Sequence, residues 1–230
     1  MRGRRARARR VIDRFDGRIL GVGSTSGVRA VVGDWVESPL GAFTDVMVAT
    51  ADHRRVLLAP SSEAAAYVWA TYSFDEVVET PVVLTEAEGP KGEPTWTVEA
   101  GPLRLDVTLG DRTTVGWLLR AVPTPFARSR PGAFLADPVA RRVYPGVRTY
   151  GSAGNGRREY YGALDQHRVV AAAGTWSGEP LGDLAEVVPV PRFGFSSTPS
   201  APALTRVVTT VVLGPASEPP SGRSLARWKA

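Results

Sequence analysis

Residues 103–109, LRLDVTL, alternate strictly between apolar and polar side chains. Leu103, Leu105, Val107 and Leu109 share one side of an extended chain, because successive side chains of a strand point to opposite faces. A strand with one apolar and one polar face is typical of an antiparallel sheet that buries one of its faces. This stretch therefore predicts a half-buried strand, and it constrains the fold more tightly than any other part of the chain.

Other stretches repeat the β pattern and are separated by turn signals. A hairpin is expected over residues 42–59 with its turn at Asp52-His53, and a second hairpin over residues 95–109 with its turn at Gly101-Pro102. Residues 86–94 are rich in Gly, Pro and Glu, which predicts a loop. Further strands are expected at residues 77–85, 134–136, 147–150, 158–163, 168–175, 193–196 and 204–213.

Only two short helices are expected. Ser61 or Ser62 can cap the first, because a serine hydroxyl accepts a hydrogen bond from a free N–H of the first turn. Thr113 or Thr114 can cap the second, VGWLLRAV, which a proline ends. Many short strands and few helices predict a mainly β protein, a single antiparallel barrel or cone-like double sheet with few unpaired edges. Such barrels often enclose a ligand cavity.

The positive charge of the chain is concentrated at its ends. Residues 1–10, MRGRRARARR, hold six arginines and no acid, so the formal net charge of +5 becomes −1 without them. We expect residues 1–13 to form a flexible basic arm, residues 14–213 a single β-rich domain, and residues 214–230 a flexible tail rich in Pro, Ser and Arg. A basic arm can bind nucleic acid through phosphate contacts. A passive tail, or a start upstream of the native one, is the alternative.

Scarce residue types exclude several kinds of chemistry. The chain has no cysteine, so disulfides, thiolate metal sites and cysteine nucleophiles are excluded. His53 and His167 lack the spacing of a zinc site, and no glycine-rich stretch precedes the helix that a dinucleotide fingerprint requires. We therefore expect neither a metal nor a cofactor. No apolar run is as long as a membrane span, and no apolar segment of a secretory signal follows the basic start, so a cytoplasmic protein is expected.

The most glycine-dense loop of the chain is GSAGNGRR, residues 151–158. Its free backbone N–H groups beside Arg157 and Arg158 could hold an anion. Asn155-Gly156 is equally a favoured hairpin turn and needs no ligand to explain it. Tyrosines on both sides of the loop could line an apolar pocket with polar groups, or simply pack between strands. They are Tyr144, Tyr150, Tyr160 and Tyr161.

The order of elements over residues 37–175 resembles that of the acetoacetate decarboxylase-like superfamily. The resemblance rests on a small-aromatic-acid stretch at residues 41–45, GAFTD, and on the helix at residues 61–71 followed by TYSFDE. It continues with Gly101-Pro102-Leu103 and with WLLRAVP, residues 117–123. It implies a cone-shaped antiparallel β domain that encloses a small apolar cavity.

The chain departs from this family where the decarboxylases carry their catalytic lysine. Those enzymes form a Schiff base with a substrate ketone through a lysine that must be neutral near pH 7. Asp75 and Glu76 occupy the corresponding positions, and the only lysines, Lys91 and Lys229, lie in a loop and in the tail. The resemblance therefore implies a related cavity without that chemistry.

We expect a protein that binds a small apolar or carboxylate-bearing molecule, or an enzyme that acts on it through acid–base chemistry. The alternatives are a lipocalin-like carrier of an apolar ligand and a nucleic-acid-associated protein. The catalytic candidates are Tyr72, Asp75 and Glu76. The candidate ligand-binding residues are Trp69, Trp117, Arg120, Tyr150, Arg157, Arg158 and Tyr160.

Overall fold

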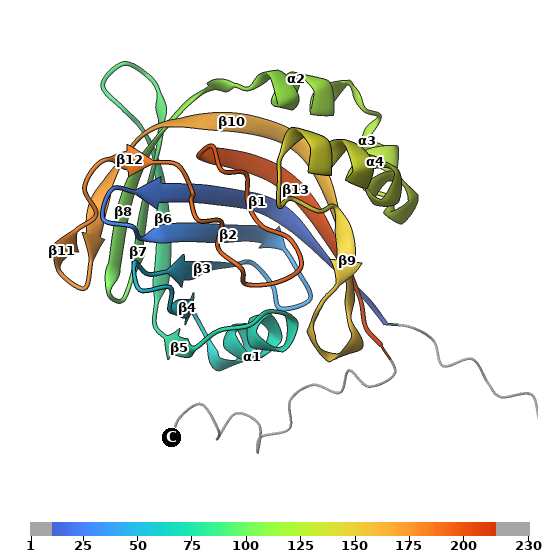
Figure 1. The fold of residues 1–230 in the computed structure, drawn as a ribbon, viewed down its shortest axis with the longest axis horizontal. Coiled ribbons are helices and arrows are strands. Elements are labelled where there is room, and N and C mark those ends of the chain that lie inside the picture. Colours follow the sequence, from blue (N-terminus) through green and yellow to red (C-terminus); the bar gives the residue numbers. More distant parts are fainter. Residues whose placement is uncertain (1–10, 215–230) are drawn as a thin grey trace, which may run out of the picture.

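The computed structural model of the protein describes residues 11–214, which form one strongly curled sheet, a half-barrel, with four helices (Figure 1). The main strands are β1 (Ile12–Ser24), β2 (Arg29–Glu37), β3 (Phe43–Ala49), β4 (Arg55–Ala59), β5 (Glu76–Glu79), β6 (Val82–Glu88), β7 (Pro94–Ala100), β8 (Leu103–Arg112), β10 (Arg158–Trp176) and β13 (Ala203–Val212). The short strands β9 (Tyr150–Ser152), β11 (Glu179–Pro180) and β12 (Leu184–Ala185) pair beside this path. The helices are α1 (Ser62–Thr71), α2 (Thr114–Ala121), α3 (Thr124–Ala127) and α4 (Arg130–Val143).

The strand order explains why the sheet curls. It runs β5-β4-β3-β2-β1-β13-β10-β8-β7-β6, so β5 and β6 lie at opposite ends of the hydrogen-bonded path. In sequence these strands are separated only by Thr80 and Pro81, a link that spans about 10 Å at most. The two edges of the sheet must therefore approach each other. Since β4 and β5 pair in parallel and the other neighbours pair antiparallel, the sheet is mixed.

Curling gives the sheet an inner face that packs against itself. Alternate residues of β1 to β4 meet alternate residues of β7 and β8 there, and the two largest members of this core, Trp96 and Leu20, are fully buried. Each such side chain stabilises the fold by about 1.5–3 kcal/mol through burial. The alternating stretch over residues 103–109 supplies β8 as predicted, with its four apolar side chains in this core.

Arg18 joins the two halves of the curled sheet. From β1 its guanidinium donates to Asp34 on β2 (Nη2–Oδ2, 2.6 Å) and to Glu86 on β6 (Nη1–Oε2, 2.9 Å). It also lies 4.5 Å above the ring of Trp96 on β7. One side chain thus links β1 and β2, in the middle of the path, to β6 at its end, with Asp34 partly buried and Glu86 exposed.

The outer face of the sheet is covered by helices. α1 packs on β4 through Ala64, Ala65 and Val68, which contact Leu57 and Ala59. α2, α3 and α4, residues 114–143, contact β10 instead and are here called the cap. Figure 1 shows the cap beside β10 and β13, with α1 at the opposite side near β5.

Several predicted elements are confirmed. The hairpins β3–β4 and β7–β8 form as expected, and Ser61 and Thr113 cap α1 and α2 by accepting from Ala64 N and Gly116 N. β13 corresponds to the strand expected at residues 204–213. The basic arm expected at residues 1–13 lies outside the described residues up to residue 10, and β1 begins at Ile12.

Other predictions are wrong, and proline accounts for two of them. Residues 134–136 are part of α4 rather than a strand: Ser129 caps this helix and Pro131 is compatible with its first turn, although Pro138 removes one hydrogen bond inside it. The strand expected at residues 77–85 is split at Pro81. Residues 11–214 form four helices instead of two, and their sheet is mixed rather than antiparallel. β10 joins the strands expected at residues 158–163 and 168–175 into one, and β6 and β7 extend into the loop expected at residues 86–94. β9 starts at the last residue of the strand expected at residues 147–150, and residues 193–196 form no strand.

We expect Arg18→Met to lower the free energy of unfolding by about 2 kcal/mol, because it leaves Asp34 and Glu86 without their shared cation. The measurement is urea unfolding at pH 7. Arg104→Met is the matched control, since Arg104 lies on the exposed surface with Glu99 and Asp106 and should change stability by less than about 0.5 kcal/mol. Equal losses in both variants would contradict the bridging role of Arg18.

Candidate functional site

A large cavity lies between the outer face of the sheet and the cap. Its volume is about 520 Å³, within the range of pockets that hold small organic molecules. β1, β2, β3, β10 and β13 contribute one wall, and the cap contributes the other. Its sides are lined by residues of two loop segments, 144 with 147–149 and 193 with 196–199.

The walls of the pocket are mostly apolar. The sheet contributes Ile19, Val31, Trp35, Met47 and Val207, which alternate along their strands with side chains of the inner core. The cap contributes a larger apolar set: Val115, Leu118, Leu119, Val122, Phe126, Leu135, Val139 and Val143.

Small residues create the space and set the position of the cap. Gly132, Ala133, Ala136 and Ala140 line the pocket from α4, where larger side chains would fill it. On β10, a Cβ at Gly162 would lie 2.2 Å from the carbonyl oxygen of Ala127 at the end of α3. Only glycine lets the backbone of α3 approach the sheet this closely.

A buried carboxyl group and two tyrosines form the main polar cluster of the site. Tyr72 and Tyr161 line the pocket, and the hydroxyl of Tyr72 donates to Glu159 Oε1 at 3.0 Å. The Tyr161 hydroxyl lies 3.2 Å from Glu159 Oε2 and 2.8 Å from the Tyr72 hydroxyl. Tyr72 follows the C-terminus of α1, whereas Glu159 and Tyr161 share one face of β10. Glu159 is 1% exposed.

Burial controls the protonation of this cluster. It raises the pKa of Glu159 to about 7, although the two tyrosine hydroxyls and the nearby Arg157 favour the charged form. Burial and the charge of Glu159 raise the pKa of Tyr72 and Tyr161 well above 10, so both keep their protons. Three oxygen–oxygen contacts join the groups. An ionised Glu159 leaves only two protons for them, whereas a protonated Glu159 supplies the third.

A second polar set surrounds Gln166 on β10. Its Oε1 accepts from the hydroxyls of Tyr144 at 2.7 Å and Thr113 at 2.8 Å, and its Nε2 donates to Thr205 Oγ1 at 3.3 Å. Tyr144, Gln166 and Thr205 all line the pocket. Their mutual hydrogen bonds satisfy the buried amide and fix the side chains where a bound molecule would meet them.

One charged side chain lines the pocket within the described part of the chain, Arg148. Its Nε donates to Oδ1 of the buried Asp137 at 2.9 Å, and Asp137 also accepts from Thr149 N at 3.0 Å. These hydrogen bonds from Arg148 and Thr149 lower the pKa of Asp137 despite its partial desolvation. This ion pair ties the cap to the segment that follows it.

Asp45 is a third buried carboxyl group, behind the wall of the pocket. Trp35 Nε1 donates to its Oδ1 at 3.0 Å, while its Oδ2 has no hydrogen-bond partner among the described residues. Burial raises the pKa of Asp45 to about 7. A Cβ at Gly33 would lie 2.7 Å from Oδ1, so this glycine leaves room for the carboxyl group.

Of the candidate catalytic residues, the structure brings only Tyr72 into the pocket. Asp75 and Glu76 lie at the exposed edge of the sheet, where they pair with Arg55 and Arg54. Hydrogen bonds from the side chain and backbone of Arg55 lower the pKa of Asp75 to about 2. The carboxylate of Asp75 is therefore ionised and forms an ion pair with Arg55.

The candidate ligand-binding residues lie outside the pocket lining: Trp69, Trp117, Arg120, Tyr150, Arg157, Arg158 and Tyr160. Four of these side chains instead contact other side chains of the protein. Trp117 stacks on Arg112, the rings of Tyr150 and Tyr160 stack on each other, and Arg120 lies 3.7 Å from Asp165.

Arg157 belongs to a hairpin rather than to an open anion loop. β9 and β10 pair across residues 154–156, where Asn155 and Gly156 have positive φ, as the Asn-Gly turn predicts. The guanidinium of Arg157 is buried and donates to Tyr67 O and Thr71 Oγ1, at the last turn of α1. It ties this hairpin to the helix that leads to Tyr72.

Glu159, Tyr161, Gln166 and Asp45 are site residues absent from the candidate catalytic and ligand-binding sets, although Tyr161 and Tyr144 were among the four tyrosines expected either to line a pocket or to pack between strands. One signal was present for the first two. Glu159 and Tyr161 are two apart in a predicted strand, so they share a face, and an acid beside a tyrosine on a buried face requires partners. Their third partner, Tyr72, is 87 residues away from Glu159 in sequence, and only the fold brings it there.

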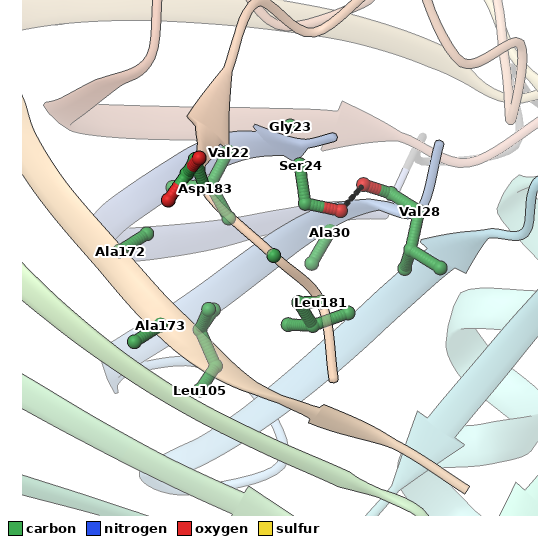
Figure 2. A pocket seen from close by; sticks show the side chains of 11 residues that line it. Val22, Gly23, Ser24, Val28, Ala30, Leu105, Ala172, Ala173, Leu181 and Asp183 are labelled. Carbon is green, nitrogen blue, oxygen red and sulfur yellow. Dashed lines mark hydrogen bonds between the residues drawn. The ribbon is translucent and has the colours of Figure 1, made fainter. Parts of the chain in front are cut away.

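A second hollow, shown in Figure 2, lies where β1 ends and β2 begins. Val22, Val28, Leu105 and Leu181 line it, and the Ser24 hydroxyl beside it donates to Val28 O at 2.8 Å. Its volume of about 10 Å³ is close to that of one water molecule. It is too small for an organic ligand.

Within residues 11–214 no cluster of three or more His, Cys, Asp or Glu side chains is arranged to hold a metal ion. None of the helices in that range is both long and apolar enough to span a bilayer. Comparison of the chain with protein-family models, curated proteins and solved structures gives no match. The resemblance to the acetoacetate decarboxylase-like superfamily therefore stays a prediction.

The buried Glu159 should make stability depend on pH. In the unfolded chain its carboxyl group ionises near pH 4.5, but in the folded protein only near pH 7. Between these values unfolding releases a proton, so rising pH favours unfolding. From pH 4.5 to pH 8 we expect the free energy of unfolding to fall by about 2–3 kcal/mol less in Glu159→Gln than in the wild type, because the variant lacks the titrating carboxyl group.

The measurement is urea unfolding of both proteins at pH 4.5 and pH 8. The comparison between them cancels the other titrating groups, Asp45 included. An identical pH dependence in the two proteins would show that Glu159 titrates normally.

Proposed function

We propose that this protein binds a small, largely apolar molecule with one hydrogen-bonding group, and that the pocket beneath the cap is the binding site. The observation that carries the proposal is a cavity of about 520 Å³ with apolar walls and a few convergent polar groups. Pockets of this kind are the usual sites for small ligands, because apolar walls provide affinity and a few polar groups fix orientation.

The polar groups suggest how the molecule would be oriented. Tyr72 and Tyr161 line the pocket, and the hydroxyl groups of both stay protonated. When Glu159 is ionised, both hydroxyls can donate to it, which leaves their lone pairs free to accept from a ligand hydroxyl or amide. When Glu159 is protonated, three protons serve the three contacts, and a ligand carbonyl or carboxyl group could accept one of them in place of the contact between the two tyrosine hydroxyls.

Schiff-base decarboxylation does not fit this pocket, because no lysine lines it in the described part of the chain. Lys91 is exposed in the turn between β6 and β7, and Lys229 lies outside the described residues. The proposed activity is therefore binding without an imine, as the departure from the decarboxylase pattern predicts. Binding of nucleic acid by the arginines of residues 1–10 also stays a prediction, because those residues are not described.

We expect Ala163→Phe, which places a ring in the pocket from β10, to weaken binding of linear alcohols at least about tenfold, since the ring would occupy space that the alkyl chain needs and each loss of about 1.4 kcal/mol is tenfold in affinity. The probes are alcohols from hexanol to dodecanol, and the measurement is isothermal titration calorimetry. Val83→Phe is the control, because Val83 is exposed on β6 away from the pocket. Absence of binding along the whole series, or equal binding by both variants, would overturn the proposal.

A second candidate is acid–base catalysis on the bound molecule. The observation in its favour is Glu159, whose pKa of about 7 lets it exchange a proton near neutral pH. Tyr72 and Tyr161 connect it to the pocket. Catalysis predicts that wild type converts one component of a small-molecule extract, seen by mass spectrometry, and that Glu159→Gln binds this component without converting it. Unchanged extract with the wild-type protein would leave binding as the function.

A further inference from the structure

The mouth of the pocket is bordered by apolar side chains that water also reaches. Leu118 of α2, Phe126 of α3, and Leu135, Val139 and Val143 of α4 line the pocket, yet each is between 45% and 65% exposed. These five side chains are here called the mouth. Pocket mouths and interface rims in water are ordinarily polar, so an apolar mouth indicates that something apolar meets it.

The exposed apolar surface continues outward from the mouth. Trp117 and Phe134 do not line the pocket but are 61% and 55% exposed. Seven of the thirteen large exposed apolar side chains of the described residues thus lie in the 30 residues of the cap. Figure 1 shows α2, α3 and α4 together at one corner of the molecule. A concentration of this kind marks an interaction surface rather than scattered exposure.

The charge of the cap and of the residues that flank it, 112–148 in all, indicates what it meets. Residues 112–148 contain seven arginines and one acid, Asp137, which is buried and paired. Every exposed charge that this segment carries is therefore positive. The rest of residues 11–213 has 12 basic and 21 acidic side chains, a net charge of −9 against +6 for the segment. Arg130 and Arg142 are exposed and have no carboxylate partner within residues 11–214.

A surface of exposed tryptophan, phenylalanine and leucine among arginines matches the interface of an anionic bilayer. Acyl chains would cover the apolar side chains, and lipid phosphates would neutralise Arg130 and Arg142, since the other five arginines pair with carboxylates of the protein. A second copy of the chain would not, because a two-fold interface between caps would place arginines against arginines.

We infer that the cap docks on an anionic lipid surface with the mouth of the pocket against it. Docking would bury the exposed apolar side chains and open the pocket directly toward the acyl region. Exchange of the bound molecule between pocket and bilayer rests on the proposed function, whereas docking itself rests only on the cap.

The test is co-sedimentation of the full chain with vesicles of phosphatidylcholine, alone or with about 30% phosphatidylglycerol. We expect the wild type to bind the anionic vesicles and to dissociate at high salt. Arg130→Ser/Arg142→Ser should reduce partitioning about thirtyfold, since each arginine near such a surface contributes about fivefold. Phe134→Ser should reduce it about tenfold, through lost apolar burial.

Val83→Ser/Arg104→Ser, on β6 and β8, is the matched control and should bind like the wild type. All four proteins contain arginines 2–10, so the contribution of those residues cancels in the comparison. Titration with dodecanol in vesicle-free solution should give equal affinities, because none of the substituted residues lines the pocket.

Three results would overturn docking: no binding of the wild type to anionic vesicles, binding of the cap variants equal to that of the wild type, or a wild-type dimer that Phe134→Ser dissociates. Dodecanol binding that persists in any of these cases would leave the proposed function intact. Vesicle binding without dodecanol binding would support docking and contradict the proposed function.

Discussion

A two-residue link between the ends of the sheet determines most of this structure. Thr80 and Pro81 join β5 at one edge to β6 at the other, so a path of ten strands must curl until its edges approach. Curling lets the inner face pack on itself, with Arg18 and Trp96 bridging the two halves. The helices are then left to cover the outer face. The pocket is the space that they do not fill.

The chemistry of the pocket follows from burial. An acid buried beside Tyr72, at the C-terminus of α1, loses its water, and its pKa rises to about 7 because only two tyrosine hydroxyls and a nearby arginine compensate. The same tyrosines reach the pocket, so a proton held by Glu159 can affect what the walls donate or accept. The cap adds an apolar mouth with arginines around it, which places the opening of the pocket and the proposed lipid-docking surface on the same three helices.

The sequence predicted the local elements better than their arrangement. Alternation in LRLDVTL and the caps at Ser61 and Thr113 are local signals, and each produced the expected strand or helix. α4 was missed because Pro131 and Pro138 resemble breaks, although the first lies in the opening turn, where proline is tolerated. The cluster around Glu159 was missed because its members are far apart in sequence. Asp75 was selected for a cavity, but it sits at an edge strand opposite an arginine.

The central claim is that the space between the sheet and the cap receives an apolar molecule. Methyl-labelled nuclear magnetic resonance tests it most directly, because valines and leucines occupy both the pocket and the inner core. On titration with dodecanol, we expect shifts at Val31, Leu119, Val139 and Val207, which line the pocket, and none at Val98 and Leu105 of the inner core. Shifts confined to the inner core or to exposed methyl groups away from the cap would contradict the account.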